Sequence, residues 1–148
     1  MDEIDTQIVA LLRTNARRSF QDIGAHVALS APAVKRRVDR LQESGVIRGY
    51  AAVVDPAALG WGTLAIVSLY CEGRMSAAEV QAVLEPHAEV VSAYTVAGES
   101  AAVLLLRARD TSHLELTLEQ IREPPGVIRT QTQVVLSTVI ERPLQTGE

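Results

Sequence analysis

Apolar residues in the first 45 positions recur every three or four residues, which is the period of an amphipathic helix. One apolar stripe runs from Asp2 to Asn15, a second follows Ser19, and a third begins after Ser30 and ends before Gly45. The pattern therefore predicts three short helices. Their inward-facing residues are Ile4, Ile8, Leu11 and Leu12, then Phe20, Ile23 and Val27, then Val34, Val38 and Leu41.

The third predicted helix carries start and stop signals. Ser30 can cap its first turn, and Pro32 falls inside that turn, where a missing N–H costs little. Gly45 ends it. Ala28 stands in the turn before it, where a left-handed backbone would cost a non-glycine residue about 1 kcal/mol. Gly24 is predicted to allow close approach where the first and second helices cross.

Residues 46–54 have the composition of a strand, interrupted by Gly49. We read this run as a short hairpin, or wing, that leads into a connecting strand. Asp55-Pro56 breaks the run, and residues 55–62 are the predicted hinge between two halves of the chain.

The second half repeats one pattern twice without repeating its residues. Each copy reads as strand, helix, strand, and together they give the order βαββαβ of a ferredoxin-like sandwich. The predicted strands are 64–71, 90–96, 102–108 and 128–140, and the predicted helices are 77–85 and 112–122. The fold class is therefore α+β, with a three-helix winged helix-turn-helix over 1–54 and the sandwich over 63–148.

Such a sandwich covers only one sheet face with helices. Val, Leu and Ala alternate through the predicted strands, so the other face would stay apolar and open. We expect it to close against a second copy of the chain by two-fold symmetry.

The third helix carries chemistry suited to DNA. At helical spacing, Ala33, Arg36, Arg37 and Arg40 form a surface beside its apolar stripe. A small residue near the start of a helix permits close approach to base edges, and guanidinium groups bind guanine edges and phosphates. The alternative is a cationic helix face that is simply solvated.

Charge is unevenly distributed, which matters more than the formal net charge of −4. Residues 13–48 carry eight basic and three acidic side chains, whereas residues 56–148 carry six basic and eleven acidic ones. An acidic second half is not expected to touch a phosphate backbone. The aromatic fraction of 3% also argues against a platform for stacking single-stranded bases.

Little in the chain favours catalysis. Cys71 is the only cysteine, lies in an apolar run and excludes an intrachain disulfide. His26, His87 and His113 fall on separate predicted elements, without metal-ligand spacing, and all three are expected at surfaces. Neither a phosphate-binding glycine motif nor a nucleophile elbow is present. We therefore expect no enzyme and no cofactor, and we expect a cytoplasmic protein because the N-terminus lacks a signal peptide pattern.

In order and spacing, these features resemble the Lrp/AsnC family of transcriptional regulators, the feast/famine regulatory proteins of bacteria and archaea. The matching pieces span essentially the whole chain. They are Asp2-Glu-Ile-Asp5, Leu29-Ser30, Val34, Arg36-Arg37-Val38, Gly45-Val-Ile-Arg-Gly-Tyr50, Asp55-Pro56 and Pro125-Gly126-Val127. The resemblance implies dimers formed through the tail sheets, assembly into octamers, and an amino-acid or related effector bound between dimers.

The chain departs from the family at one loop. Where the family often has Gly-Asp-x-Asp, this sequence reads Gly98-Glu-Ser-Ala101, so the ammonium group of an effector loses one counter-charge. By resemblance, the candidate effector contacts are Tyr94, Val96, Gly98, Glu99, Ser100, Thr130 and Thr132. The alternative for Gly98 is that it only makes a tight turn between strands.

A dimer with two recognition helices predicts a pseudo-palindromic operator whose half-sites lie about one helical turn, or a multiple of it, apart. Arg36 and Arg37 are predicted at bases or adjacent phosphates, with Arg37 the more structural because it lies nearer the apolar stripe. The full set of candidate DNA contacts is Ser30, Ala31, Ala33, Lys35, Arg36, Arg37, Arg40 and Arg48. Two alternatives stay open: an architectural protein that wraps DNA with little sequence preference, and a metabolic enzyme or regulatory subunit.

Overall fold

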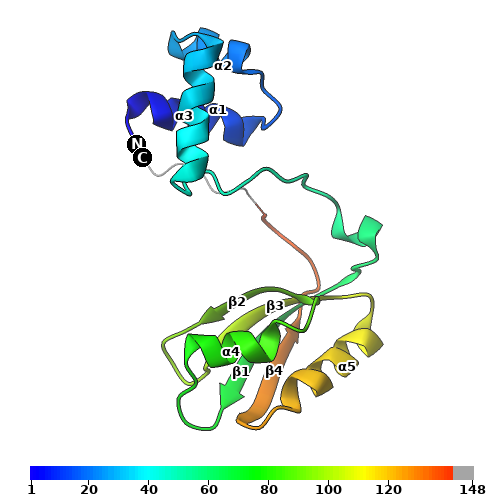
Figure 1. Ribbon diagram of the computed structural model, residues 1–148. Helices are drawn as coiled ribbons and strands as arrows, with labels where there is room; N and C mark the ends of the chain where they lie inside the picture. The colour runs from blue at the N-terminus through cyan, green and yellow to red at the C-terminus, as the bar shows by residue number, and fades with distance from the viewer. Residues whose placement is uncertain (142–148) are drawn as a thin grey trace. The chain divides into compact units, whose positions relative to one another are not determined.

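The computed structural model describes residues 1–141, and these form two compact units, Met1–Val53 and Val54–Glu141. The first unit holds three helices: α1 (Glu3–Thr14), α2 (Phe20–Val27) and α3 (Ala31–Glu43) (Figure 1). The second holds the strands β1 (Thr63–Cys71), β2 (Val90–Thr95), β3 (Ala102–Ala108) and β4 (Val127–Val134), the helices α4 (Ala77–Leu84) and α5 (Thr111–Arg122), and a short 3-10 helix η1 (Pro56–Leu59).

The three predicted N-terminal helices are confirmed. Asp2 caps α1 through a capping box with Asp5, and Ser19 caps α2 by accepting a hydrogen bond from the backbone N–H of Asp22. The apolar stripes meet in one core, centred on the fully buried Ile8, Ile23 and Val34. Burial of these stripes fixes how α3 packs on α1 and α2, and it sends the other faces of α3 outward.

The turn between α2 and α3 is tight. Ala28 takes the predicted left-handed conformation, with φ of 54°. Gly24 is also required, but for a different reason than predicted: a Cβ there would strike the carbonyl oxygen of Leu29, in the turn itself. The backbone N–H of Leu29 donates to the carbonyl of Gly24 at 3.0 Å, which holds the turn closed.

Two local predictions for the N-terminal unit are wrong. Residues 46–54 form no hairpin and no strand, so there is no wing in the described structure. The segment is anchored at its start instead, because the N–H of Ile47 donates to the carbonyl of Leu41 at 3.0 Å and its side chain packs on the helical core. Ser30 does occupy the N-cap position of α3, but its side chain makes no capping hydrogen bond.

The second unit is the predicted ferredoxin-like sandwich. Its four strands are antiparallel in the order β2-β3-β1-β4, and both α4 and α5 lie on one face of the sheet (Figure 1). The alternation of the sequence explains the arrangement: Ala65, Val67 and Leu69 of β1 point into the core, as do Leu104 and Leu106 of β3.

Within residues 54–141, no helix lies on the opposite sheet face, as predicted (Figure 1). Ile66 pairs with Leu105, and Val103 pairs with Tyr94, so these four side chains share that face. Ile66 and Tyr94 are exposed. An exposed apolar sheet face of this kind is typical of an interaction surface.

The last strand is shorter than predicted: β4 ends at Val134, not at residue 140. One further ladder bond joins the N–H of Val135 to the carbonyl of Leu64. Beyond it the neighbouring strand β1, which begins at Thr63, offers no partner. The end of the predicted sandwich, residues 142–148, lies outside the described residues.

The predicted hinge has structure of its own. Asp55 caps η1, and the indole of Trp61 stacks on His113 of α5, with ring centroids 6.2 Å apart. This segment falls within the Val54–Glu141 unit. Across residues 1–141, the helices are all too short or too polar to cross a lipid bilayer.

Candidate nucleic-acid interface and effector pocket

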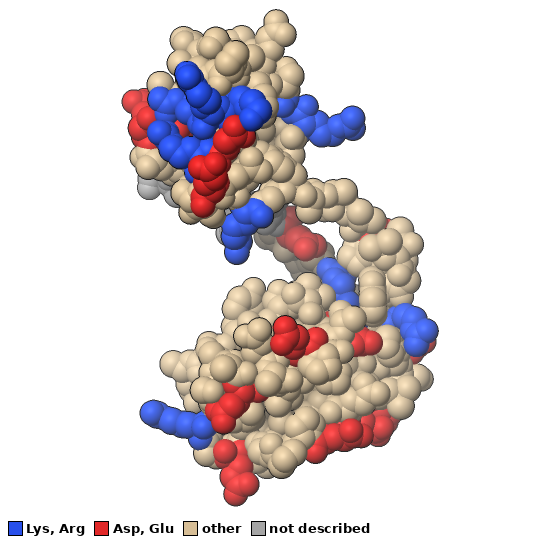
Figure 2. All heavy atoms as spheres, viewed as in Figure 1, with Lys and Arg blue, Asp and Glu red and all other residues tan. Residues whose placement is uncertain are grey.

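Basic side chains gather on the visible face of the N-terminal unit, with acidic ones among them (Figure 2). The most relevant is Arg36, an exposed residue in the first half of α3. It is the one α3 cation that has no ion-pair partner within residues 1–141. Its guanidinium group can therefore bind a ligand without breaking an ion pair within those residues.

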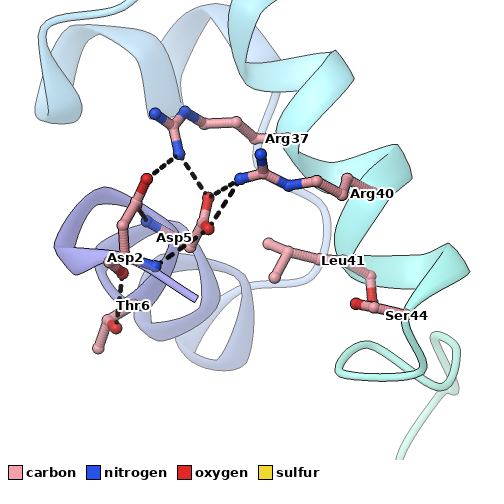
Figure 3. A network of polar contacts seen from close by, with 7 residues as sticks. All are labelled: Asp2, Asp5, Thr6, Arg37, Arg40, Leu41 and Ser44. Carbon is pink, nitrogen blue, oxygen red and sulfur yellow. Dashed lines mark hydrogen bonds and ion pairs between the residues drawn. The ribbon is translucent and has the colours of Figure 1, made fainter.

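Arg37 and Arg40 are held differently: both reach back to α1 and meet the carboxylate of Asp5 (Figure 3). Arg37 Nη1 donates to Asp5 Oδ1 at 2.7 Å and to Asp2 Oδ2 at 2.6 Å. Arg40 Nη2 donates to Asp5 Oδ2 at 2.9 Å and to Asp5 Oδ1 at 3.2 Å. The side chain of Asp5 is only 3% exposed, so a nearly buried carboxylate joins two guanidinium groups.

The contacts in this network shift the pKa values of Asp2, Asp5 and Arg37 toward their charged forms. Burial alone raises the pKa of the Asp5 carboxyl. Hydrogen bonds from Arg37 and from the backbone N–H of Asp2, with the nearby Arg40 charge, outweigh that effect and leave the pKa below 3.8. The Arg37 hydrogen bond lowers the pKa of Asp2, and the same contact raises the pKa of Arg37. The carboxyl groups of Asp2 and Asp5 are therefore ionised at neutral pH.

The other predicted DNA contacts lie on or next to α3. Lys35 is exposed but forms an ion pair with Asp39 at 2.6 Å, one turn further along the helix. Ala31 and Ala33 lie in the first turn, and Ser30 is exposed just before it. Arg48 is exposed in the segment after α3. The structure thus brings most of the predicted set onto one helix, but it engages three of the basic residues with carboxylates.

A second candidate site lies in the C-terminal unit, where the loop after β2 meets the loop after β1. It is a pocket of about 420 Å³ lined by the predicted residues Val96, Gly98, Glu99 and Ser100. Sequence reasoning missed the other wall, which includes Cys71, Arg74 and Met75. Nothing in their local pattern indicates that this loop folds toward Gly98. Burial raises the pKa of the Cys71 thiol, so it lines the pocket as a neutral group.

The remaining predicted effector residues lie elsewhere in the chain. Tyr94 is on the uncovered sheet face. Thr130 and Thr132 belong to β4, which lies at the opposite edge of the sheet from β2. They pair with Leu69 and Val67 of β1. None of these three residues lines the pocket.

One histidine prediction is wrong. His113 does not lie at the surface: its side chain is largely buried, and its Nε2 lies 3.0 Å from Glu89 Oε1. Its Nδ1 accepts from the backbone N–H and the guanidinium Nε of Arg109. These contacts and the Trp61 stack give it a structural role. Within residues 1–141, no group of histidine, cysteine and acidic residues has a metal-binding arrangement.

A helix-turn-helix unit with a basic third helix, joined to a ferredoxin-like unit with a small pocket, is the arrangement expected of a DNA-binding regulator that responds to a small ligand. Family models match both parts: an AsnC-type helix-turn-helix domain over residues 1–42 and an Lrp/AsnC ligand binding domain over residues 64–145. The chain belongs to the Lrp/AsnC family.

Relatives and solved structures agree with this assignment. The chain is 50% identical over 142 residues to the HTH-type transcriptional regulator Rv2324 of Mycobacterium tuberculosis, covering 96% of each chain. It matches the crystal structure of the M. tuberculosis leucine response regulatory protein LrpA with a TM-score of 0.87 and 33% identity, over 98% of this chain and 99% of that one. It also matches the M. tuberculosis feast or famine regulatory protein Rv3291c complexed with L-methionine, with a TM-score of 0.89, 34% identity and 97% coverage of each chain. These names favour a regulator over an architectural protein.

Proposed function

We propose that the protein binds duplex DNA through the exposed side of α3, with Arg36 as the residue that reads base edges. The observation that carries this proposal is the ion-pair pattern of α3. Arg36 is exposed and unengaged among the described residues, whereas its neighbours Lys35 and Arg37 hold carboxylates. Ser30, whose hydroxyl is not used as a cap, is suited to a phosphate at the start of the helix.

The test starts by selecting bound sequences from a pool of random duplexes. Arg36→Ala should weaken binding of the full chain to the selected duplex by roughly 1–3 kcal/mol and flatten its sequence preference. The matched control is Arg17→Ala, which removes an exposed arginine of the same unit outside α3. Equal affinities for the Arg36→Ala variant and the wild type would overturn the assignment.

We further propose that two chains associate through the uncovered sheet face, so that two copies of α3 read a pseudo-palindromic operator. Assembly of dimers into octamers is what the family resemblance implies. Ile66→Glu would place a charge at the centre of that face and should shift the particle toward the monomer in light scattering. Thr111→Glu, at an exposed position of α5, serves as the control. Unchanged mass for the Ile66→Glu variant would contradict this interface.

The pocket beside Gly98 is the proposed effector site. Its lining suits a zwitterionic amino acid with an apolar side chain: Glu99 is opposite in charge to an ammonium group, and Arg74 to a carboxylate. Met75, Val96 and Ala97 supply apolar surface. A volume of about 420 Å³ is within the range of small-molecule sites. The related protein that was solved with L-methionine supports this class of ligand.

Titration calorimetry with L-methionine, L-lysine and L-aspartate would test the pocket. We expect L-methionine to bind most tightly, and Glu99→Gln to weaken it. Glu72→Gln removes a nearby exposed carboxylate that does not line the pocket, and it should leave binding unchanged. Binding of none of the three, or equal loss in both variants, would count against the site.

Regulation would follow if the ligand binds more tightly to one assembly or one DNA-bound arrangement than to another. A role in the cytoplasm, where duplex DNA and free amino acids meet, fits this proposal.

A further inference from the structure

Two arginines of α3 contact the acidic start of α1. Arg37 and Arg40 are three residues apart, so they lie on the same side of the helix. Both are turned onto Asp5, although the Arg40 side chain is 61% exposed and has open solvent available. Asp5 therefore acts on residues of α3 that lie more than thirty positions away in the sequence.

The contact is well suited to holding two side chains. Asp5 receives hydrogen bonds from both guanidinium groups and from the backbone N–H of Asp2, at distances between 2.7 and 3.2 Å. A nearly buried carboxylate loses little of this attraction to solvent, whereas an exposed pair such as Lys35–Asp39 is screened by water and salt. Lys35 can therefore leave its partner for a phosphate more readily than Arg37 can.

We infer that Asp5 is a positioning residue for DNA recognition: it keeps Arg37 and Arg40 against α1 and thereby withholds them from the phosphate backbone. Contacts to phosphates carry no sequence information directly, and they supply nearly all of non-specific binding. Holding two arginines back lowers the affinity for any duplex and leaves a larger share of the binding to base contacts by Arg36. This inference rests on the proposed DNA-binding function.

The consequence is measurable as salt dependence. Each arginine that neutralises a phosphate steepens the slope of log K against log salt concentration by about 0.9. Asp5→Asn keeps the shape of the side chain and its carbonyl oxygen, but it removes the charge that holds both guanidinium groups. We expect the variant to bind a random-sequence duplex several-fold more tightly than the wild type does, with a steeper salt slope and a smaller preference for the selected duplex.

Glu3→Gln is the matched control, because it makes the same change of charge two residues away on α1. Glu3 is exposed and forms no ion pair within the part of the chain that the structure describes. It should therefore leave the salt slope unchanged. Adding Arg37→Gln to Asp5→Asn should return the slope toward the wild-type value, which a general loss of structure would not do.

Asp2→Asn provides a second route, should Asp5→Asn fail to fold as judged by circular dichroism. Asp2 is half exposed and contacts Arg37 but not Arg40. Its variant should therefore steepen the salt slope in the same direction as Asp5→Asn, by a smaller amount.

Two results would overturn the inference: a slope in the aspartate variants equal to that of Glu3→Gln, or weaker binding to both duplexes with a shallower slope. Either is distinguishable from failure of the proposed function. If the function itself fails, the wild type shows no salt-sensitive binding and Arg36→Ala changes nothing.

Discussion

The two units of this chain are stabilised by different means. The C-terminal core is made of eleven buried apolar residues, and the one buried polar side chain beside it, Thr117, bonds to a carbonyl of its own helix. The N-terminal core has seven buried apolar residues, and the same unit also buries the charged residue Asp5. The sandwich is therefore packed mainly by apolar side chains, with the His113–Glu89 contact as an addition, while the helical unit also has ion pairs that join α1 to α3.

This difference bears on function. Apolar packing of the β1–β4 sheet is less sensitive to salt and to moderate acid than ion pairs are. Ion pairs at the edge of a DNA-binding helix respond to salt, acid and phosphates.

The largest expected effect lies in the apolar core. Leu104→Ala removes a side chain that is 1% exposed and should destabilise the C-terminal unit by about 2–5 kcal/mol. Denaturant unfolding followed by the fluorescence of Trp61, the only tryptophan, reports on that unit. Leu116→Ala makes the same chemical change at an exposed position of α5 and should have little effect. Equal losses in the two variants would show that packing of the core is not what stabilises this unit.

A smaller effect is expected at the helix-turn-helix turn. Gly24→Ala places a methyl group against the carbonyl oxygen of Leu29, and that backbone atom cannot move without opening the turn. We expect a loss of about 1–3 kcal/mol, measured by hydrogen exchange of the amides of α2. Ala25→Ser adds an atom at the neighbouring exposed position and should change the exchange very little. Slow exchange retained in Gly24→Ala would contradict the close contact.

Acid is expected to destabilise the N-terminal unit at a higher pH than the C-terminal unit. Because the pKa values of Asp2 and Asp5 are lowered from 3.8 in the folded protein, their contribution to stability is fully present above that pH. It is lost as the pH falls through the folded-state values. As the pH is lowered, the hydrogen-exchange protection factors of amides in α1–α3 should therefore fall before those of amides in β1–β4 do. Asp5→Asn should reduce this acid dependence, and an unchanged profile would argue against the network.

The smallest expected effect is stabilising. Ala28 holds a left-handed backbone with φ of 54°, which glycine adopts without steric cost. Ala28→Gly should stabilise the N-terminal unit by up to about 1 kcal/mol. Ala25→Gly, in the right-handed body of α2, should destabilise it by a similar amount. The same sign for both variants would show that the conformation at position 28 does not govern the result.

Elements with a clear hydrophobic period were predictable from the sequence. The apolar stripes of α1 to α3 recur with the helical period, and the apolar residues of β1 and β3 alternate with the strand period. Each pattern predicted the correct element because each of these elements buries one face in a core. Residues 46–54 show where this fails. Their composition favours a strand, but no neighbouring strand is available to pair with them in the described chain. The extent of β4 was overestimated for the same reason.

The candidate site was predictable in outline only. Spacing placed Arg36, Arg37 and Arg40 on one helix, but it could not show that two of them turn back to α1. Carboxylates at the cap and third positions of α1, and arginines three apart on α3, were the available signal. Their pairing depends on how α1 crosses α3, which is a tertiary property. The Arg74 wall of the pocket was missed because a loop without periodicity supplies it.

Hydrogen exchange of the full chain, with and without the selected duplex, tests the DNA-binding claim most directly. The account predicts slower exchange around Ser30 and along the first half of α3, and no change in the β1–β4 sheet. Protection of the sheet with α3 unaffected would contradict it.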